Sequence, residues 1–199
     1  MSTWGDRWQQ IQGKTCWVVC RIMLHLAGRE VVPLLGILNR AAQQAIESEG
    51  DLRVLGADLV DICQALLQYD TYWRSIANEG DSFWQEGEAE SYVNELFTDS
   101  AQRYRGSEVG VLGEDDEPFT LPVSENLVVM LTIAYSGEAS ALETDLSQRF
   151  ALQAALKTII NLHYQERLAA IQVHYCPARF GDQLTEEQLL LNFPELIPL

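Results

Sequence analysis

The cysteines and histidines of this chain are its best candidates for metal ligands, and their spacing does not form a familiar site. Cys16, Cys20 and His25 follow one another within ten residues, and His174 and Cys176 alternate along one predicted strand. Neither set has the paired spacing of zinc ligands. A disulfide framework is not expected either, because the chain is long and carries no secretory signal. We therefore predict buried structural thiols, with no metal and no cofactor.

Three other segments resemble parts of known sites. Gly13-Lys14-Thr15 resembles the end of a phosphate-binding loop, but Trp8 stands where the first glycine is required. The acidic run Glu114–Glu117 lacks the alternating ligands and the glycine of a calcium loop. Ser136 follows a predicted strand without the Gly-x-Ser-x-Gly pattern of a nucleophile elbow. Since carboxylates are too numerous for any pair to identify an acid–base couple, we predict that the protein is not an enzyme.

Aromatic residues offer a different kind of site. Tyr72, Trp73, Phe83 and Trp84 are predicted to gather at the junction of two helices. Rings that stay exposed there would form a surface for a protein partner, whereas core packing would bury them. An alternative function is a small-molecule or pigment site in a cleft between two parts of the fold, where Trp73, Trp84 and Tyr135 would converge.

Helical periodicity dominates the N-terminal half. Apolar residues recur every three or four positions in segments 4–26, 31–49 and 52–73, and more weakly in a fourth segment that follows Gly80-Asp81. Short loops between amphipathic helices are typical of an antiparallel bundle. We therefore predict a helical bundle over residues 1–105.

The C-terminal half has a different pattern. Asn126–Tyr135 is apolar on both alternating faces, which predicts a strand inside a sheet whose two faces are covered. A helix from about Leu146 to about His163 and a second strand, Arg167–Cys176, follow it. This order predicts a parallel, right-handed βαβ unit. Thr185–Gln188 has the character of a capping box and predicts the start of a short helix.

The predicted fold class is therefore α+β, in which the antiparallel helical bundle is followed by a small C-terminal α/β unit with a βαβ core. Residues 106–122 are predicted as a linker or extended connection, and residues 123–199 as the α/β unit. The two units either remain separate or pack as one domain.

Charge limits the classes of partner. The 199 residues include 29 acidic and 13 basic side chains, for a formal charge of −16. Such a surface disfavours nucleic acids and anionic membranes as direct partners and leaves proteins as the expected ones. No segment approaches the ~18 apolar residues of a membrane span, and no targeting segment is recognisable at the N-terminus. We predict a soluble, cytoplasmic protein.

The C-terminal motifs resemble the DUF1517 family of cyanobacteria and plastids. The similarity lies in Asn126–Tyr135, in Arg167–Pro177 and in the closing segment that runs from Gly181 to Leu196, with a weaker match at Gln68–Trp73. It covers roughly residues 50 to 199. Gln172 and His174 stand near the positions where members carry Glu and Trp, and the hydrophobic leader of many members is missing. The chain is thus identified as a divergent, soluble member.

What the resemblance implies is a physiological setting rather than a reaction. A plant member of the family, the fluctuating-light acclimation protein, is tied to thylakoid photoprotection, and no catalytic residues can be carried over. By this analogy we expect a cyanobacterial regulatory or assembly factor that acts by protein–protein interaction and has at most peripheral contact with the thylakoid membrane.

Overall fold

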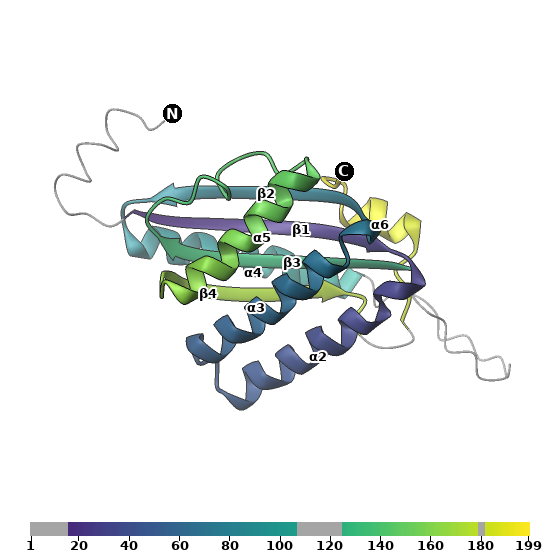
Figure 1. The fold of residues 1–199 in the computed structure, drawn as a ribbon, viewed down its shortest axis with the longest axis horizontal. Helices are drawn as coiled ribbons and strands as arrows, with labels where there is room; N and C mark the ends of the chain where they lie inside the picture. The colour runs from purple at the N-terminus through teal and green to yellow at the C-terminus, as the bar shows by residue number, and fades with distance from the viewer. Residues whose placement is uncertain (1–15, 107–124, 179–181) are drawn as a thin grey trace, which may run out of the picture.

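The computed structural model describes residues 16–106, 125–178 and 182–199. Within these ranges the chain forms one antiparallel sheet with the strand order β4-β3-β1-β2-β5. Figure 1 shows the sheet face-on, with strands β1 (Trp17–Ala27), β2 (Trp73–Phe83), β3 (Asn126–Ser136) and β4 (Leu168–Cys176). The short strand β5 (Ile197–Pro198) pairs with β2 at the other edge. The predicted α+β class is confirmed at this level.

Helices cover both faces of the sheet. One face packs against α2 (Val32–Glu47), α3 (Leu52–Gln68) and α5 (Arg149–Tyr164), and the other against α4 (Glu86–Gly106) and α6 (Glu186–Asn192). Short 3-10 turns at Arg29–Val31 and Asp70–Tyr72 lead into α2 and β2. Apolar side chains therefore pack on both sides of the sheet.

The strand predicted at Asn126–Tyr135 is confirmed. β3 lies between β1 and β4, and its residues from Leu127 to Tyr135 are all buried. Helices on both faces require apolar side chains at odd and even positions alike, which explains its continuous apolar sequence.

The predicted helix over residues 4–26 is wrong in the part that the structure describes. Residues 1–15 lie outside the described ranges, and Trp17–Ala27 is strand β1, paired with β2 and β3. Its residues from Val18 to Leu26 are buried, as in β3. A nearly unbroken apolar run satisfies the three- and four-residue spacing by chance, so periodicity could not separate a helix from a buried strand.

The predicted helix over residues 52–73 extends too far, and the fourth helix begins later than expected. α3 ends at Gln68, Trp73–Phe83 forms β2, and α4 starts at Glu86. Gly80 marks a close approach of β2 to β1, because a Cβ there would lie 2.6 Å from the Val19 carbonyl oxygen. Glycine in a strand is typical of such a contact, so Gly80 lies within β2 and does not precede a helix.

The predicted parallel βαβ unit is also wrong, because β3 and β4 are antiparallel neighbours. The reason is the connection after β3. Residues 137–148 pass beside Asn78 on β2, and Arg149 at the start of α5 donates to the Trp73 carbonyl at the far end of the sheet. α5 then returns the chain to Arg167, whose carbonyl accepts from the Ser136 amide. The loop carries the chain to the far end of the sheet, and α5 brings it back to the end where β3 stopped. β4 therefore starts beside the last residue of β3 and runs in the opposite direction.

The separate N-terminal bundle is not observed, because β1 and β2 belong to the same sheet as β3 and β4. The predicted linker 106–122 lies outside the described residues except for Gly106. The predicted helix starts are confirmed at α3 and α6. The Asp51 carboxylate accepts from the amides of Arg53 and Val54 at the start of α3, and Thr185 and Gln188 form the capping box of α6.

Candidate functional site

A row of polar side chains crosses the sheet beneath α4. Gln172 on β4, Thr132 on β3, Arg21 on β1 and Glu79 on β2 are cross-strand neighbours. Arg21 is only 3% exposed. The sequence signal for this row was Arg21, a charged residue at the centre of an apolar strand. Periodicity alone did not single it out, because the residues around it are apolar.

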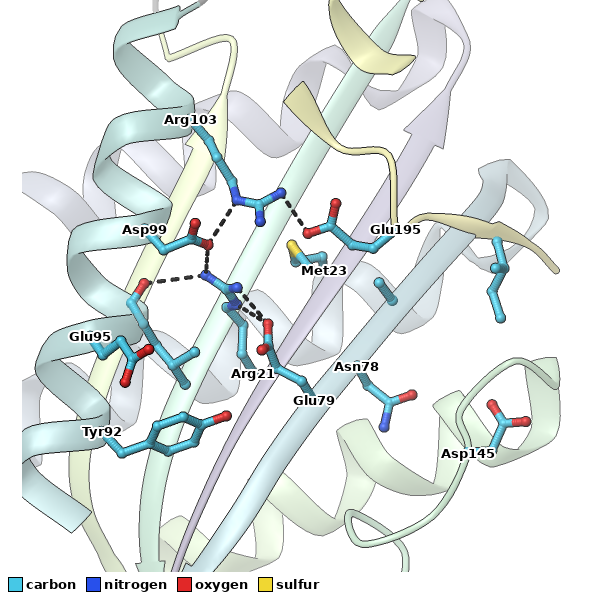
Figure 2. Close-up of a pocket in the computed structure, with 13 residues that line it drawn as sticks. Arg21, Met23, Asn78, Glu79, Tyr92, Glu95, Asp99, Arg103, Asp145 and Glu195 are labelled. Atoms are coloured by element: carbon cyan, nitrogen blue, oxygen red, sulfur yellow. Dashed lines mark hydrogen bonds and ion pairs between the residues drawn. The ribbon is translucent and has the colours of Figure 1, made fainter. Parts of the chain in front are cut away.

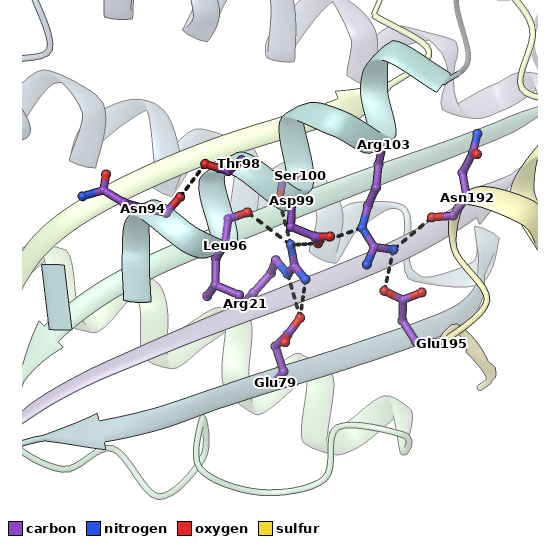
Figure 3. Close-up of polar contacts among 10 residues, drawn as sticks. All are labelled: Arg21, Glu79, Asn94, Leu96, Thr98, Asp99, Ser100, Arg103, Asn192 and Glu195. Carbon is purple, nitrogen blue, oxygen red and sulfur yellow. Dashed lines mark hydrogen bonds and ion pairs between the residues drawn. The ribbon is translucent and has the colours of Figure 1, made fainter. Parts of the chain in front are cut away.

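Charged and polar groups surround the Arg21 guanidinium. Its Nε and Nη2 donate to Glu79, while Nη1 donates to Asp99 Oδ2 at 2.6 Å and to Ser100 Oγ at 2.9 Å. Nη1 also lies 3.2 Å from the Leu96 carbonyl oxygen (Figure 3). Hydrogen bonds to carboxylates are strong because both partners are charged.

Arg103 extends this network to the end of the chain. Its Nε donates to Asp99 Oδ2 at 2.8 Å, and its Nη1 donates to the Asn192 carbonyl at 2.9 Å and pairs with Glu195. The guanidinium also lies over the Phe193 ring. The two arginines thus connect β1, β2 and α4 to the segment that follows α6.

A cavity of about 530 Å³ lies beside this network (Figure 2). Five carboxylates line it together with the two arginines, namely Glu79, Glu95, Asp99, Asp145 and Glu195. Burial opposes the ionisation of Asp99, but hydrogen bonds from Arg103 and Arg21 outweigh it and lower its pKa. A carboxylate held ionised between two arginines is a poor proton donor or acceptor at neutral pH. The arrangement is that of a clamp that fastens α4 and the C-terminal segment to the sheet.

A second surface lies at the β4 edge of the sheet. A hollow of about 240 Å³ is lined by residues of α2 and α3, by Phe97 of α4 and by Ile171–Tyr175 of β4. We call it the β4-edge groove. Figure 1 shows α2 projecting past β4, and a hydrogen bond of 2.9 Å from Tyr175 Oη to Asn39 Oδ1 connects the two elements.

Among the described residues, three that line the β4-edge groove each have a buried polar atom without a hydrogen-bond partner. They are Asp58, at Oδ2, on the α3 side of β4, and Gln172, at Oε1, and His174, at Nδ1, whose side chains lie on the α4 side. Buried polar atoms are nearly always paired in folded proteins, so a further hydrogen-bond donor near Asp58 Oδ2 would be favourable. Asp58 stands between Leu55 and Ile62 on the apolar stripe of α3, a position from which sequence reasoning could have singled it out.

Burial affects the protonation of two of these groups. It raises the pKa of the Asp58 carboxyl, as does the nearby Asp61, while Arg40 opposes the shift. It lowers the pKa of His174, as does the positive charge of Arg21. The groove therefore offers a neutral imidazole at neutral pH and a carboxyl group whose ionisation would be favoured by an additional cation.

The aromatic residues predicted as a partner site do not form one cluster. Tyr72 and Trp73 lie at the start of β2, whereas Phe83 and Trp84 lie at its end. Trp73 is fully buried, and the other three are half-buried. β2 is a strand of eleven residues, so about 30 Å separates its two ends. A helical assignment of residues 73–83 shortens the distance between these rings, so the sequence interpretation brought them together.

The proposed pigment cleft is not assembled by these residues either. Trp73 and Tyr135 are both fully buried in the core beneath α2, α3 and α5, at opposite ends of the sheet. Trp84 follows the far end of β2 from Trp73. The three rings therefore do not converge, and pigment binding stays a prediction without a site.

The candidate metal ligands are also dispersed. Cys20 lies in the core on the sheet face that α2, α3 and α5 cover, where burial and then Glu143 raise its thiol pKa to about 12, whereas His25 contacts Ser75 and Asn126. Within the described ranges, no three His, Cys, Asp or Glu side chains gather as metal ligands would. Gly13-Lys14-Thr15 and the run Glu114–Glu117 lie outside those ranges.

Comparison with known proteins adds a family but no activity. Residues 17–199 match the family described as "Protein of unknown function (DUF1517)". No curated protein and no solved structure matches the chain. In the part of the chain that the structure describes, no helix has the length and apolar character to cross a membrane.

Proposed function

We propose that this chain, which belongs to the DUF1517 family, is a non-enzymatic regulatory or assembly factor that binds an extended segment of a partner protein in the β4-edge groove. The observation that carries the proposal is the position of β4, an edge strand of the described sheet, between a groove that contains the buried carboxyl group of Asp58 and the half-exposed ring of Phe97. The photosynthetic setting, in a cyanobacterium, is the part of the proposal that follows from the family resemblance alone.

Strand addition fits the composition of β4. An edge strand presents backbone N–H and C=O groups to an incoming chain, and proteins usually protect such edges with charges or proline. The outer edge of β2 follows this rule with Glu79 and Asp81, and β5 pairs with its first part. β4 contains no Asp, Glu, Lys, Arg or Pro between Leu168 and Cys176. Its sequence therefore favours pairing rather than preventing it.

The overhang of α2 supports the same conclusion. Ala41, Ala42 and Ala45 of α2 line the groove, and Ala42 is exposed. On the opposite side of β4, Phe97 is 46% exposed and lies beside the His174 ring. A strand added to β4 would be covered by α2 on one face and by Phe97 on the other, as β3 is covered within the sheet.

Site-specific cross-linking tests this proposal. The photoreactive residue p-benzoylphenylalanine would replace Phe97 in one version of the protein and Phe150, which is 72% exposed on α5, in the other. In an extract of photosynthetic cells, we expect position 97 to capture one polypeptide through one extended segment, and position 150 not to capture it. Ala42→Arg, which fills the groove, should abolish the cross-link, whereas Gln43→Arg adds the same charge to α2 outside the groove and should leave it intact.

Two results would count against the proposal. Cross-linking at position 97 that persists with Ala42→Arg would show that the partner does not occupy the groove. Equal capture of the same polypeptide from positions 97 and 150 would indicate non-specific contact. If the segment comes from a metabolic enzyme rather than a photosynthetic protein, the groove remains the site and the photosynthetic setting falls.

A further inference from the structure

Asp58 places a carboxyl group in the otherwise apolar α2 and α3 side of the β4-edge groove. It lies on α3, is only 8% exposed, and lines the groove among Leu55, Leu59 and Ile62. Its Oδ2 atom is buried without a hydrogen-bond partner among the described residues. An isolated buried carboxylate is unfavourable unless a cation or a hydrogen-bond donor accompanies it.

The cation that acts on Asp58 within the described residues is already engaged. Arg40 on α2 is close enough to Asp58 to favour its ionised form, but its Nη2 donates to Asp61 Oδ2 at 3.0 Å. That pair is exposed, since both side chains keep more than half of their accessible surface. Asp58 thus faces the groove while its neighbour on the same helix holds the arginine.

The position of Asp58 defines what an incoming strand would have to offer. Alternate side chains of that strand would face α2 and α3, where they meet alanine methyl groups, Ile171 and Val173. Lysine and arginine have long apolar stems that can lie along such a surface while the charged head reaches a carboxylate. Small apolar residues suit the positions two residues before and after it.

From these contacts we infer that the β4-edge groove selects a partner segment carrying a lysine or arginine, which forms an ion pair with Asp58, between small apolar residues on the same face. This inference rests on the proposed function, since it names the chemistry of the segment bound there. The formal charge of −16 supports it, because a strongly acidic protein attracts basic segments before contact is made.

Peptide selection gives a direct test. Twelve-residue random peptides displayed on phage would be selected against the whole chain, and enriched peptides would be measured by fluorescence anisotropy, each beside a copy with norleucine in place of its basic residue. We expect one enriched basic position whose replacement by norleucine weakens binding by about tenfold, the effect of roughly 1.4 kcal/mol. Asp58→Asn should weaken the basic peptide similarly and leave the norleucine copy almost unchanged.

The matched control is Glu47→Gln, which removes one carboxylate from α2 outside the groove and should change the affinity less than about twofold. Circular dichroism would confirm that both variants are folded. Peptides that lose their binding in the Ala42→Arg variant, and so occupy the groove, yet show no basic preference would overturn this inference and leave the proposed function standing. A basic preference that survives Asp58→Asn would overturn it as well. If Ala42→Arg weakens the binding of none of the selected peptides, the proposed function itself fails.

Discussion

At the scale of single residues, Arg21 illustrates how a charge can be buried in the middle of a sheet. Its guanidinium cannot lose its proton at any relevant pH, so burial requires carboxylates rather than a pKa shift. Glu79 and Asp99 supply them, and both remain about 40% exposed to water. The network therefore connects the buried arginine to the surface and fastens α4 to the strands beneath it.

Replacing Arg21 should destabilise the fold measurably. Arg21→Met removes the hydrogen-bond donor of Glu79 and leaves Asp99 with Arg103 alone, and we expect a loss of about 2 to 3 kcal/mol, less than for a fully buried pair because the carboxylates can be hydrated. Arg21→Lys keeps the charge but not the forked geometry, so its stability should lie between that of the unsubstituted protein and that of Arg21→Met. Urea denaturation would measure both. A loss below about 0.5 kcal/mol for Arg21→Met would show that the network contributes little.

At the scale of elements, the close contact between α3 and α5 requires a glycine at position 56. A Cβ at Gly56 of α3 would lie 2.2 Å from Nδ1 of His163 on α5. Gly36 of α2 makes no such contact, since nothing lies within 4 Å of the corresponding position. Two helical glycines in the same layer therefore have different reasons for their presence.

This difference predicts opposite effects of alanine. Gly36→Ala should stabilise the protein by up to about 1 kcal/mol, because alanine favours a helix over glycine. Gly56→Ala gains the same amount but must displace His163, so we expect a net loss of about 1 kcal/mol. In a His163→Ala background, Gly56→Ala should become stabilising. A double-mutant cycle by thermal and urea denaturation measures the coupling, and a coupling near zero would contradict the close contact.

At the scale of the whole molecule, two buried histidines connect stability to pH. Burial lowers the pKa of His25, and Arg74 adds to this effect, although Asn126 and Glu186 oppose it. His174 is shifted in the same direction by burial and Arg21. Both folded-state pKa values lie below the unfolded value of about 6.5. The unfolded chain therefore binds more protons below that pH, and stability present above it is lost as the pH falls.

We therefore expect the free energy of unfolding to decrease from pH 7.5 to pH 5.5. The decrease should be smaller in the double variant His25→Asn with His174→Gln, whatever its absolute stability, because those titrations are then absent. His163→Gln, which removes a histidine from α5, serves as the control for the loss of a histidine elsewhere. Urea denaturation at both pH values provides the comparison. An unchanged pH dependence in the double variant would rule out these two residues as its source.

Several features could be predicted because they depend on neighbours along the chain. The caps at Asp51 and Thr185 and the helix after Pro33 involve residues within four positions of one another. The doubly covered strand at Asn126–Tyr135 was recognisable from its composition, and the family from its C-terminal motifs. Locally encoded features of this kind need no knowledge of the rest of the fold.

The sequence alone therefore determined the α+β class, the α2–α3 pair, the buried β3 strand and membership of DUF1517. Only the tertiary structure decided that Trp17–Ala27 is a strand and that β4 runs opposite to β3, since a continuous apolar run and a connecting loop each permit two arrangements. It alone also brought Arg21 to Glu79 and Asp99, 58 and 78 residues away, and placed Asp58 beside β4. Contacts across such separations depend on which strands pair, and pairing is settled by the burial of the whole sheet rather than by any local pattern.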